Sequence, residues 1–383
     1  MNKPSLLALL GVFLKLGTTA FGGPAMIPYI KKAVVERHGW LDEKDFSLGM
    51  GAAQLVPGAT AMQVAAWAGL RIRGTAGAFV AYLGFSLPAF LLMLGLSILY
   101  FKGADLPRIQ AAFAGLQVVV VALVLSAAFD FALQYCDSIR ARLLALGAGI
   151  WLAFKGNPVI ALVVVCLLAV PLFRELPALR PDAPPGGRRG GFLVPFCLVL
   201  IAVACWLVLH SYLPELGGLA ALMARIDLFA FGGGYVSVPL MLHEVVEVRG
   251  WLTEAGFMDG IALGQLTPGP IVMTATFVGY KVAGLVGAAV ATVAVFTPSF
   301  IILHFIAPVS RLLVASPVAA RMLKGSLISL VGLMAAVAGR FVLSTDWTAV
   351  SVAIAVGAFI ALRMRVDVLR VVACGAAAAT FLL

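Results

Sequence analysis

Long runs of hydrophobic residues follow one another along almost the whole chain, and short polar segments separate them. Each run holds about 18–25 apolar residues, which is enough for a helix to cross a hydrocarbon core of roughly 30 Å. The runs are continuous rather than alternating, and this favours helices over a transmembrane β-barrel. The pattern predicts an all-α polytopic membrane protein.

The runs predict about 13 transmembrane segments, arranged as six, one and six. The first six cover residues 5–22, 46–69, 75–100, 109–134, 140–154 and 157–173. The last six cover residues 215–233, 257–280, 283–307, 318–342, 346–362 and 365–383. We therefore divide the chain into a first repeat (1–173), a cytoplasmic linker rich in Pro, Gly and Arg (174–191), one extra connecting helix (192–213) and a second repeat (214–383).

The two halves carry the same residues in the same order, with two one-residue shifts of register. The first half contains Phe21-Gly22-Gly23, Gly39-Trp40-Leu41, Gln54, Pro57-Gly58, Met62, Gly69, Gly74, Gly77 and Pro88. The second half contains Phe231-Gly232-Gly233, Gly250-Trp251-Leu252, Gln265, Pro268-Gly269, Met273, Gly279, Gly284, Gly287 and Pro298. A single extra helix between the halves would insert the second one upside down. Such inverted-topology repeats are typical of secondary transporters.

Charge refines this interpretation without changing the class. The chain has 383 residues, of which 62% are hydrophobic and 11% charged, and its net charge is +10. The bases concentrate in short loops, and their bias places the N-terminus inside a multi-pass protein of the inner (plasma) membrane, with no role in binding nucleic acid. The loop 31–45 is an exception to this bias. If 5–22 is a full span, the four bases of the loop lie on the outer side of the membrane.

The reactive side chains do not form a recognisable catalytic or metal-binding pattern. The five cysteines include no C-x-x-C pair, and the four histidines lack metal-ligand spacing. We expect no cofactor, no metal and no enzymatic activity.

Two breaks interrupt the apolar segments of each half. The first break is Phe21, Gly22, Gly23 and Pro24, and its counterpart is Phe231, Gly232, Gly233 and Gly234. The second is Gln54, Pro57 and Gly58, and its counterpart is Gln265, Thr267, Pro268, Gly269 and Pro270. Gly and Pro interrupt a helix and leave its N-terminal N–H groups available to an anion inside the membrane. We predict that these residues bind the substrate; the alternative is that they only permit kinks and close packing.

Charged residues inside the spans point to the same region. Lys15 and Arg225 each lie six residues before the Phe of the first break, so a base occupies one repeat position twice. Each base costs roughly 3 kcal/mol in the membrane, which suggests that the pair neutralises an anion, although snorkelling to the interface is the alternative. Asp227 lies nearby, with Gly17 in its place in the first half, and is a candidate for proton coupling or for a salt bridge to Arg225.

These motifs resemble the chromate ion transporter family. The second half carries FGGGYVSVPL, GWL and DGIALGQLTPGPIVMTATFVGY, and the first half carries LKLGTTAFGGP, GWL and AQLVPGA. The resemblance implies duplicated domains of opposite topology, no bound cofactor, and efflux that lowers cytoplasmic chromate and confers resistance. We therefore expect a secondary active transporter that exports chromate by alternating access. Another oxyanion such as sulfate, a structural membrane protein, and a homodimeric assembly remain open alternatives.

Overall fold

The computed structural model describes residues 4–19, 26–103, 107–175, 191–231 and 233–382, and helices without strands form its regular structure. The first repeat contains α1 (Leu6–Thr19), α2 (Met26–Lys31), η2 (Lys32–Arg37), α3 (Glu43–Leu55), α4 (Thr60–Gly103), α5 (Pro107–Tyr135), α6 (Ile139–Ala153) and α7 (Pro158–Leu172). The connecting helix is α8 (Leu193–Tyr212). The second repeat contains α9 (Pro214–Phe229), η3 (Gly234–Val236), α10 (Ser237–Met241), η4 (Leu242–Val248), α11 (Glu254–Leu266), η5 (Ile271–Met273), α12 (Thr274–Ile306), η6 (Ala307–Val309), α13 (Ser310–Val314), α14 (Pro317–Ser344), α15 (Ala349–Arg363) and α16 (Val368–Leu382).

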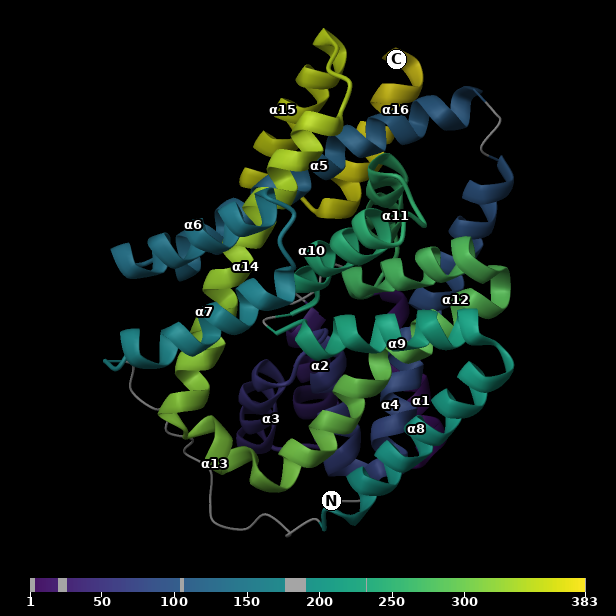
Figure 1. The fold of residues 1–383 in the computed structure, drawn as a ribbon. Helices are drawn as coiled ribbons and strands as arrows, with labels where there is room; N and C mark the ends of the chain where they lie inside the picture. Colours follow the sequence, from purple (N-terminus) through teal and green to yellow (C-terminus); the bar gives the residue numbers. More distant parts are fainter. Residues whose placement is uncertain (1–3, 20–25, 104–106, 176–190, 232, 383) are drawn as a thin grey trace.

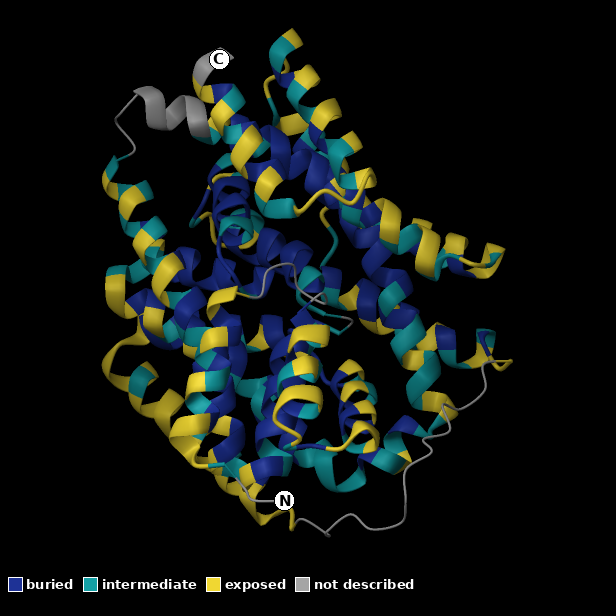
Figure 2. Ribbon diagram, turned by 180° about the vertical axis from the view of Figure 1, so that it is seen from behind, coloured by how far each residue is buried: buried dark blue, intermediate teal, exposed yellow. Residues whose placement is uncertain are grey.

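Five helical stretches in the described part of the chain are long and apolar enough to cross a membrane, and this confirms the class of polytopic membrane protein. They are residues 60–103, 113–135, 193–212, 271–314 and 317–344. Many large apolar side chains are exposed. Exposed residues lie along the exterior of the helical assembly (Figure 1), and buried residues gather towards its middle (Figure 2). α8 is almost entirely exposed, as expected for a helix that faces lipid.

The predicted span 46–69 is wrong as a single crossing. α3 and the first arm of α4 (60–73) are two antiparallel helices joined by a turn at 56–59. The outer ends of both helices lie together, because Arg71 forms an ion pair with Asp45 and the indole Nε1 of Trp67 donates a 3.0 Å hydrogen bond to the Asp45 carbonyl. The segment therefore enters the protein and returns to the side on which it began.

The predicted span 257–280 is corrected in the same way. α11 and the helix that starts at Ile271 run antiparallel, since a Cβ on Gly260 would lie 2.6 Å from Phe277 and one on Gly264 would lie 3.2 Å from Thr274. Gly49 meets Trp67 at the corresponding place in the first repeat. Hydropathy could not reveal this return, because both arms are apolar and their sum has the length of one crossing.

α1 and α2 belong to a third returning segment, so the predicted 5–22 is not a full span. The described α1 has 14 residues and rises about 21 Å. Its start lies beside Arg73, whose Nε donates to the Pro4 carbonyl, while Lys31 at the end of α2 pairs with Glu43 at the start of α3. The chain has thus returned to the starting side by residue 43.

The second arm of each long helix turns back against the first at a sharp corner. Gly74 (φ +69°) and Gly284 (φ +58°) form the two corners. At the corners a Cβ on Gly69 would lie 2.2 Å from the Gly77 carbonyl oxygen, and one on Gly279 would lie 2.3 Å from that of Gly287. Glycines therefore allow the two backbones to touch where any side chain would separate them.

The repeats interlock rather than stand side by side. α14 of the second repeat packs against α5, α6 and α7 of the first, and α5 packs against α15 and α16 (Figure 1). α4 and α12 contact each other. α1 packs against α4, and α9 packs against α12. α3 packs on α13, and α11 packs on α5, so each short helix contacts the other repeat.

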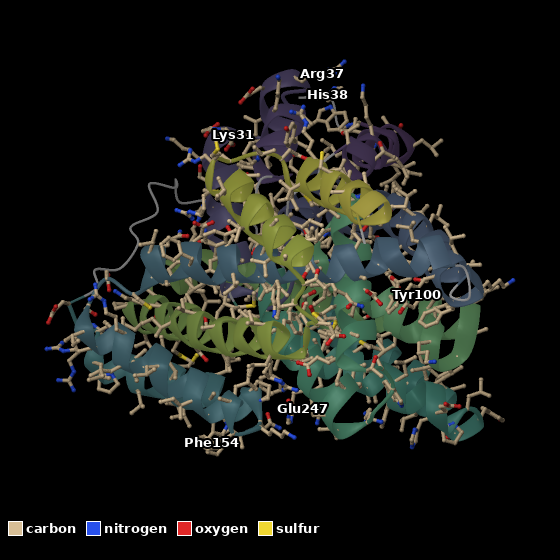
Figure 3. All side chains as sticks on the ribbon, turned by 90° about the horizontal axis from the view of Figure 1, so that it is seen from above. Lys31, Arg37, His38, Tyr100, Phe154 and Glu247 are labelled. Atoms are coloured by element: carbon tan, nitrogen blue, oxygen red, sulfur yellow. The ribbon has the colours of Figure 1, made fainter. Side chains whose placement is uncertain are left out.

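Two opposite sides can be assigned from these contacts. We call one the Asp45 side, where Pro4, Asp45 and Arg71 lie, and the other the Glu254 side, where Glu254 pairs with Arg340. α14 begins just after α13, on the Asp45 side, and its 28 residues rise about 42 Å before it ends on the Glu254 side. Figure 3 shows Lys31, Arg37 and His38 together at one edge of the molecule and Glu247 near the opposite edge.

Candidate functional site

Three of the four predicted breaks meet in the interior of the protein. The backbone N–H of Gly58 donates a 2.9 Å hydrogen bond to the carbonyl oxygen of Ala230, which immediately precedes Phe231. A Cβ on Gly233 would lie 3.6 Å from Thr60 Oγ1, and one on Gly234 would lie 3.2 Å from Val272. The break at 230–234 therefore lies between the break at 56–59 and the break at 267–270. The fourth break, Phe21, Gly22, Gly23 and Pro24, lies outside the described residues, as does Gly232.

The two Pro-Gly turns pack in matching places on the opposite repeats. A Cβ on Gly58 would lie 3.0 Å from Ser299 Cβ, directly after Pro298 of α12. A Cβ on Gly269 would lie 2.8 Å from Ala89 Cβ, directly after Pro88 of α4. Gly58 (φ +94°) and Gly269 (φ +117°) also adopt backbone conformations that disfavour other residues. The glycines are thus required both by the turn and by the contact between repeats.

Helix N-termini start at this junction. The helical runs that begin at Thr60, Gly234 and Ile271 start at or directly after the three breaks. The first N–H groups of a helix lack partners within it, and the helix dipole adds positive potential at the same end. Three such ends provide donors for an anion without placing a formal positive charge inside the membrane.

Asp227 lies beside Gly58 and Ser299 at this junction and is 1% exposed. Its Oδ2 accepts a 2.7 Å hydrogen bond from the backbone N–H of Ser299, while Oδ1 has no hydrogen-bond partner among the described residues. A Cβ on Gly58 would lie 2.4 Å from that Oδ1. Tyr82 of α4 also reaches the cluster, with its hydroxyl 3.2 Å from Ser299 Oγ. One carboxyl group is thus surrounded by atoms of both repeats.

Gln63 is a second buried polar group at the junction. Its side chain is fully buried, and Nε2 donates a 3.0 Å hydrogen bond to the Pro57 carbonyl. Its Oε1, like Asp227 Oδ1, has no partner within the described residues. Sequence reasoning missed Gln63, Tyr82, Ser299 and Thr60. The signal that could have found Gln63 was an amide inside an otherwise apolar segment.

The remaining predicted residues divide between the junction and the surface. Pro57, Pro268, Thr267 and Pro270 are buried in the turns, and Thr267 Oγ1 donates to the Gly264 carbonyl. Phe231 and Gln265 are partly buried, whereas Gln54 is exposed. The two glutamines of the matching motifs therefore differ in environment.

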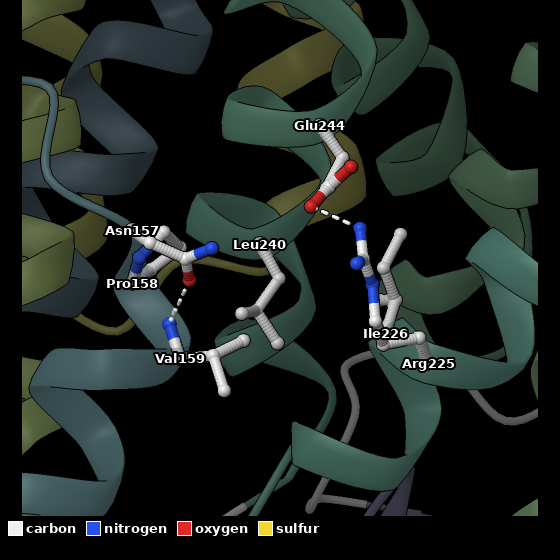
Figure 4. A pocket seen from close by; sticks show the side chains of 7 residues that line it. All are labelled: Asn157, Pro158, Val159, Arg225, Ile226, Leu240 and Glu244. Carbon is white, nitrogen blue, oxygen red and sulfur yellow. Dashed lines mark hydrogen bonds and ion pairs between the residues drawn. The ribbon is translucent and has the colours of Figure 1, made fainter. Parts of the chain in front are cut away.

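The predicted pair of bases lies away from the junction. Lys15 is exposed on α1, and its carbonyl accepts hydrogen bonds from Thr18 and Thr19. Arg225 forms an ion pair with Glu244 of η4 (Figure 4). The cavity beside Arg225 has a volume of only about 10 Å³, which is the space of a single water molecule. Of the two alternatives for Asp227, the salt bridge to Arg225 is not formed.

A charged cluster closes the Glu254 side. Arg340 of α14 forms ion pairs with Glu247 and with Glu254, and His243 Nδ1 lies 2.6 Å from Glu247 Oε2. Arg225 and Glu244 extend the cluster to α9. The cluster ties α14 to α9, η4 and α11, so it joins four helical elements of the second repeat. The sequence alone did not indicate Arg340, because 93 residues separate it from Glu247.

Comparison with known proteins connects this arrangement to one family. The family model described as Chromate transporter matches residues 7–170 and 217–380, one match for each repeat. An uncharacterised transporter of Methanocaldococcus jannaschii is 41% identical over 374 residues, covering 97% of this chain and 93% of the relative. Chromate transport proteins of Pseudomonas aeruginosa and Cupriavidus metallidurans are 33% and 32% identical, covering 78% and 77% of this chain and 71% and 72% of the relatives. No solved structure matches the chain.

Proposed function

The chain belongs to the chromate transporter family, and from this premise we propose that it is a secondary transporter that exports chromate across the inner membrane by alternating access. Export would lower cytoplasmic chromate and so confer resistance to it. The observation that carries the proposal is the meeting of three helix breaks around Gly58, Ala230 and Gly233. An oxyanion bound there would face helix N-termini from both repeats.

We also propose that the repeats have inverted topology. The first repeat enters and returns twice before the second arm of α4 leaves the Asp45 side, and α8 is the one extra crossing between the repeats. The two repeats have related structures of opposite orientation and share a central site. When one repeat moves against the other, the site can open to one side of the membrane or to the opposite side. The corrected returns at 46–69 and 257–280 change the number of full crossings and leave this relation intact.

The Asp45 side is proposed to be cytoplasmic. The corrected topology brings the four bases of loop 31–45 to the side that holds Arg71, which removes the exception noted in the sequence. Other bases on or near this side are Arg73, Arg311, Arg321 and Lys324. An excess of bases in short loops marks the cytoplasmic side.

Electrical energy favours export by this route. A dianion that leaves an inside-negative cell gains about 4.6 kcal/mol per 100 mV, twice the value for a single charge. Asp227 is the proposed group that couples this export to proton movement, because it is a buried carboxyl group at the point where the repeats meet.

The test is the flux of radiolabelled chromate in proteoliposomes, with a membrane potential and a pH gradient imposed separately. We expect efflux from the compartment facing the Asp45 side to accelerate when that compartment is negative. A flux that ignores the potential would contradict electrogenic export, and a flux no greater than that of protein-free liposomes would contradict chromate transport. Excess unlabelled sulfate reports whether the site also accepts another tetrahedral dianion.

A purely structural role predicts a different result. In that case chromate flux in the wild type does not exceed that of protein-free liposomes.

A further inference from the structure

A second cavity lies on the Asp45 side, away from the junction of the breaks. It has a volume of about 260 Å³, and its lining consists of Leu48 of α3, Arg71 of α4 and residues 307–312 of η6 and α13. Leu48 and Ser310 are buried, whereas Leu312 is 75% exposed. The cavity therefore has a floor between the repeats and a rim at the surface. Since a water molecule takes about 30 Å³, it can hold a tetrahedral oxyanion with part of its hydration shell.

Two arginines give this cavity a positive character. Arg71 binds both carboxylate oxygens of Asp45 through Nη2 alone, at 2.6 and 2.7 Å. Its Nε and Nη1 make no hydrogen bond to other described residues, so three of its five N–H donors remain for a ligand. Arg311, also in the lining, forms no ion pair within the part of the chain that the structure describes. Arginine donors suit planar and tetrahedral oxyanions.

The lining residues of this cavity can be compared with the residues at equivalent positions of the other repeat. The lining residues Leu48, Arg71, Ser310 and Arg311 correspond to Asp259, Lys281, Tyr100 and Phe101 on the Glu254 side. There Tyr100 and Phe101 fill the equivalent space: the ring centroids of both lie about 5 Å from that of Phe277, and Phe101 also stacks on Tyr280.

The cavity on the Asp45 side and the equivalent place on the Glu254 side also differ in their polar and charged side chains. Asp259 accepts hydrogen bonds from the Tyr100 hydroxyl at 2.8 Å and from Gln117 Nε2 at 2.9 Å. The corner on the Glu254 side thus contains the acid Asp259, the base Lys281 and stacked rings, while the Asp45 corner contains an apolar floor, the ion pair of Arg71 with Asp45, a second arginine and open space. The same backbone arrangement thus leaves a cavity on the Asp45 side, whereas aromatic side chains occupy the corresponding place on the Glu254 side.

We propose that the cavity between α3, α4 and α13 is the vestibule in which the transporter captures its oxyanion from the cytoplasm, with Arg71 and Arg311 as the attracting groups. The inference rests on the proposed function for its substrate and on the Asp45 side being cytoplasmic. Clefts lined by one sign of charge concentrate counter-ions and raise association rates, so the arginines act on capture rather than on the later movement through the membrane.

The test compares matched substitutions in the intact protein. Arg311→Gln is expected to raise the KM for chromate presented to the Asp45 side about three- to tenfold while the maximal rate stays within about twofold, and Arg311→Lys restores most of the affinity. Leu48→Asp introduces the acid found at the equivalent position, Asp259, and is expected to raise the KM further. Leu48→Asn adds a polar group without charge, so it shows whether polarity alone has this effect. Arg140→Gln is the control, because Arg140 is an exposed base paired with Glu175 outside the cavity.

Equilibrium binding of chromate and of sulfate to the purified protein in nanodiscs gives a readout that does not depend on transport. Weaker binding of either anion by Arg311→Gln and Leu48→Asp, but not by Arg140→Gln or Leu48→Asn, supports the vestibule. Equal affinities and equal KM values in all variants overturn it, even if the wild type transports chromate. Absence of chromate flux in the wild type with charge-dependent oxyanion binding preserved overturns the proposed function and leaves the vestibule standing.

Discussion

The backbone N–H of Gly58 and the carbonyl oxygen of Ala230 are joined by a 2.9 Å hydrogen bond, although 172 residues separate them in the chain. Gly58 lies in the second break of the first repeat, and Ala230 lies at the first break of the second repeat. The bond therefore joins the second break of one repeat to the first break of the other, and Gly58 lies beside Asp227.

Gly58→Ala should disrupt both the turn and the junction. The φ of +94° strains any other residue by about 1–3 kcal/mol, and the added Cβ would lie 2.4 Å from Asp227 Oδ1. We expect chromate flux to fall by at least about tenfold. The control is Gly11→Ala, which meets no atom within 4 Å and replaces a helical glycine, so its flux should be unchanged. Equal flux in both variants would remove the junction from the transport mechanism.

Asp227→Asn should separate proton coupling from folding. Asparagine has the shape of aspartate and can still accept the Ser299 N–H through its carbonyl oxygen, but it cannot release a proton. We expect the protein to fold and to bind chromate while its flux no longer responds to an imposed pH gradient. Asp227→Ala instead leaves the Ser299 N–H without its acceptor and should lower stability by about 1–3 kcal/mol. A pH-driven flux that survives in the Asn variant would exclude Asp227 as the coupling group.

Arg340→Gln should destabilise the Glu254 side. It leaves Glu247 and Glu254 close together without their shared cation, at positions where each side chain is less than one quarter exposed. The double variant Arg340→Gln/Glu247→Gln should recover part of the loss, with a coupling energy of about 0.5–3 kcal/mol. Thermal unfolding of the four proteins in the same detergent measures this cycle. Additive losses would show that the pair contributes nothing beyond its separate members.

The Asp137–Lys324 pair should make stability depend on pH in the acid range. The 2.8 Å hydrogen bond from Lys324 holds the pKa of Asp137 below its usual value. A lowered pKa in the folded state means that the stabilisation is complete above the unfolded pKa of about 3.9 and is lost as the pH falls through the folded value.

Because Asp137 is 59% exposed, the contribution is small, about 0.2–1 kcal/mol at neutral pH. Asp137→Asn should lower the unfolding temperature slightly at pH 7 and have no effect at pH 2. The comparison of wild type and variant at both pH values in one detergent checks this, and a constant difference across pH would argue against the ion pair.

The sequence by itself determined the class of the protein, the duplication and the positions of the three breaks that the structure describes. Apolar length reports burial in a membrane, and recurrent Gly and Pro report where a helix cannot continue; both are local properties of the chain. α3 ends at Leu55 and α11 ends at Leu266, next to the Pro-Gly turns that the motifs predicted. The family resemblance rested on the same motifs and is confirmed by matches to both halves.

Only the tertiary structure decided which segments cross and which side chains meet. An apolar run of 24 residues can be one crossing or two returning arms, and the ion pair between Asp45 and Arg71 selects the second. The same is true of charge: Lys15 and Arg225 occupy one repeat position, yet Arg225 lies beside Glu244 and Asp227 lies beside Gly58. Such partners come from distant segments, and their pairing follows from how the two repeats interlock, which no local pattern encodes.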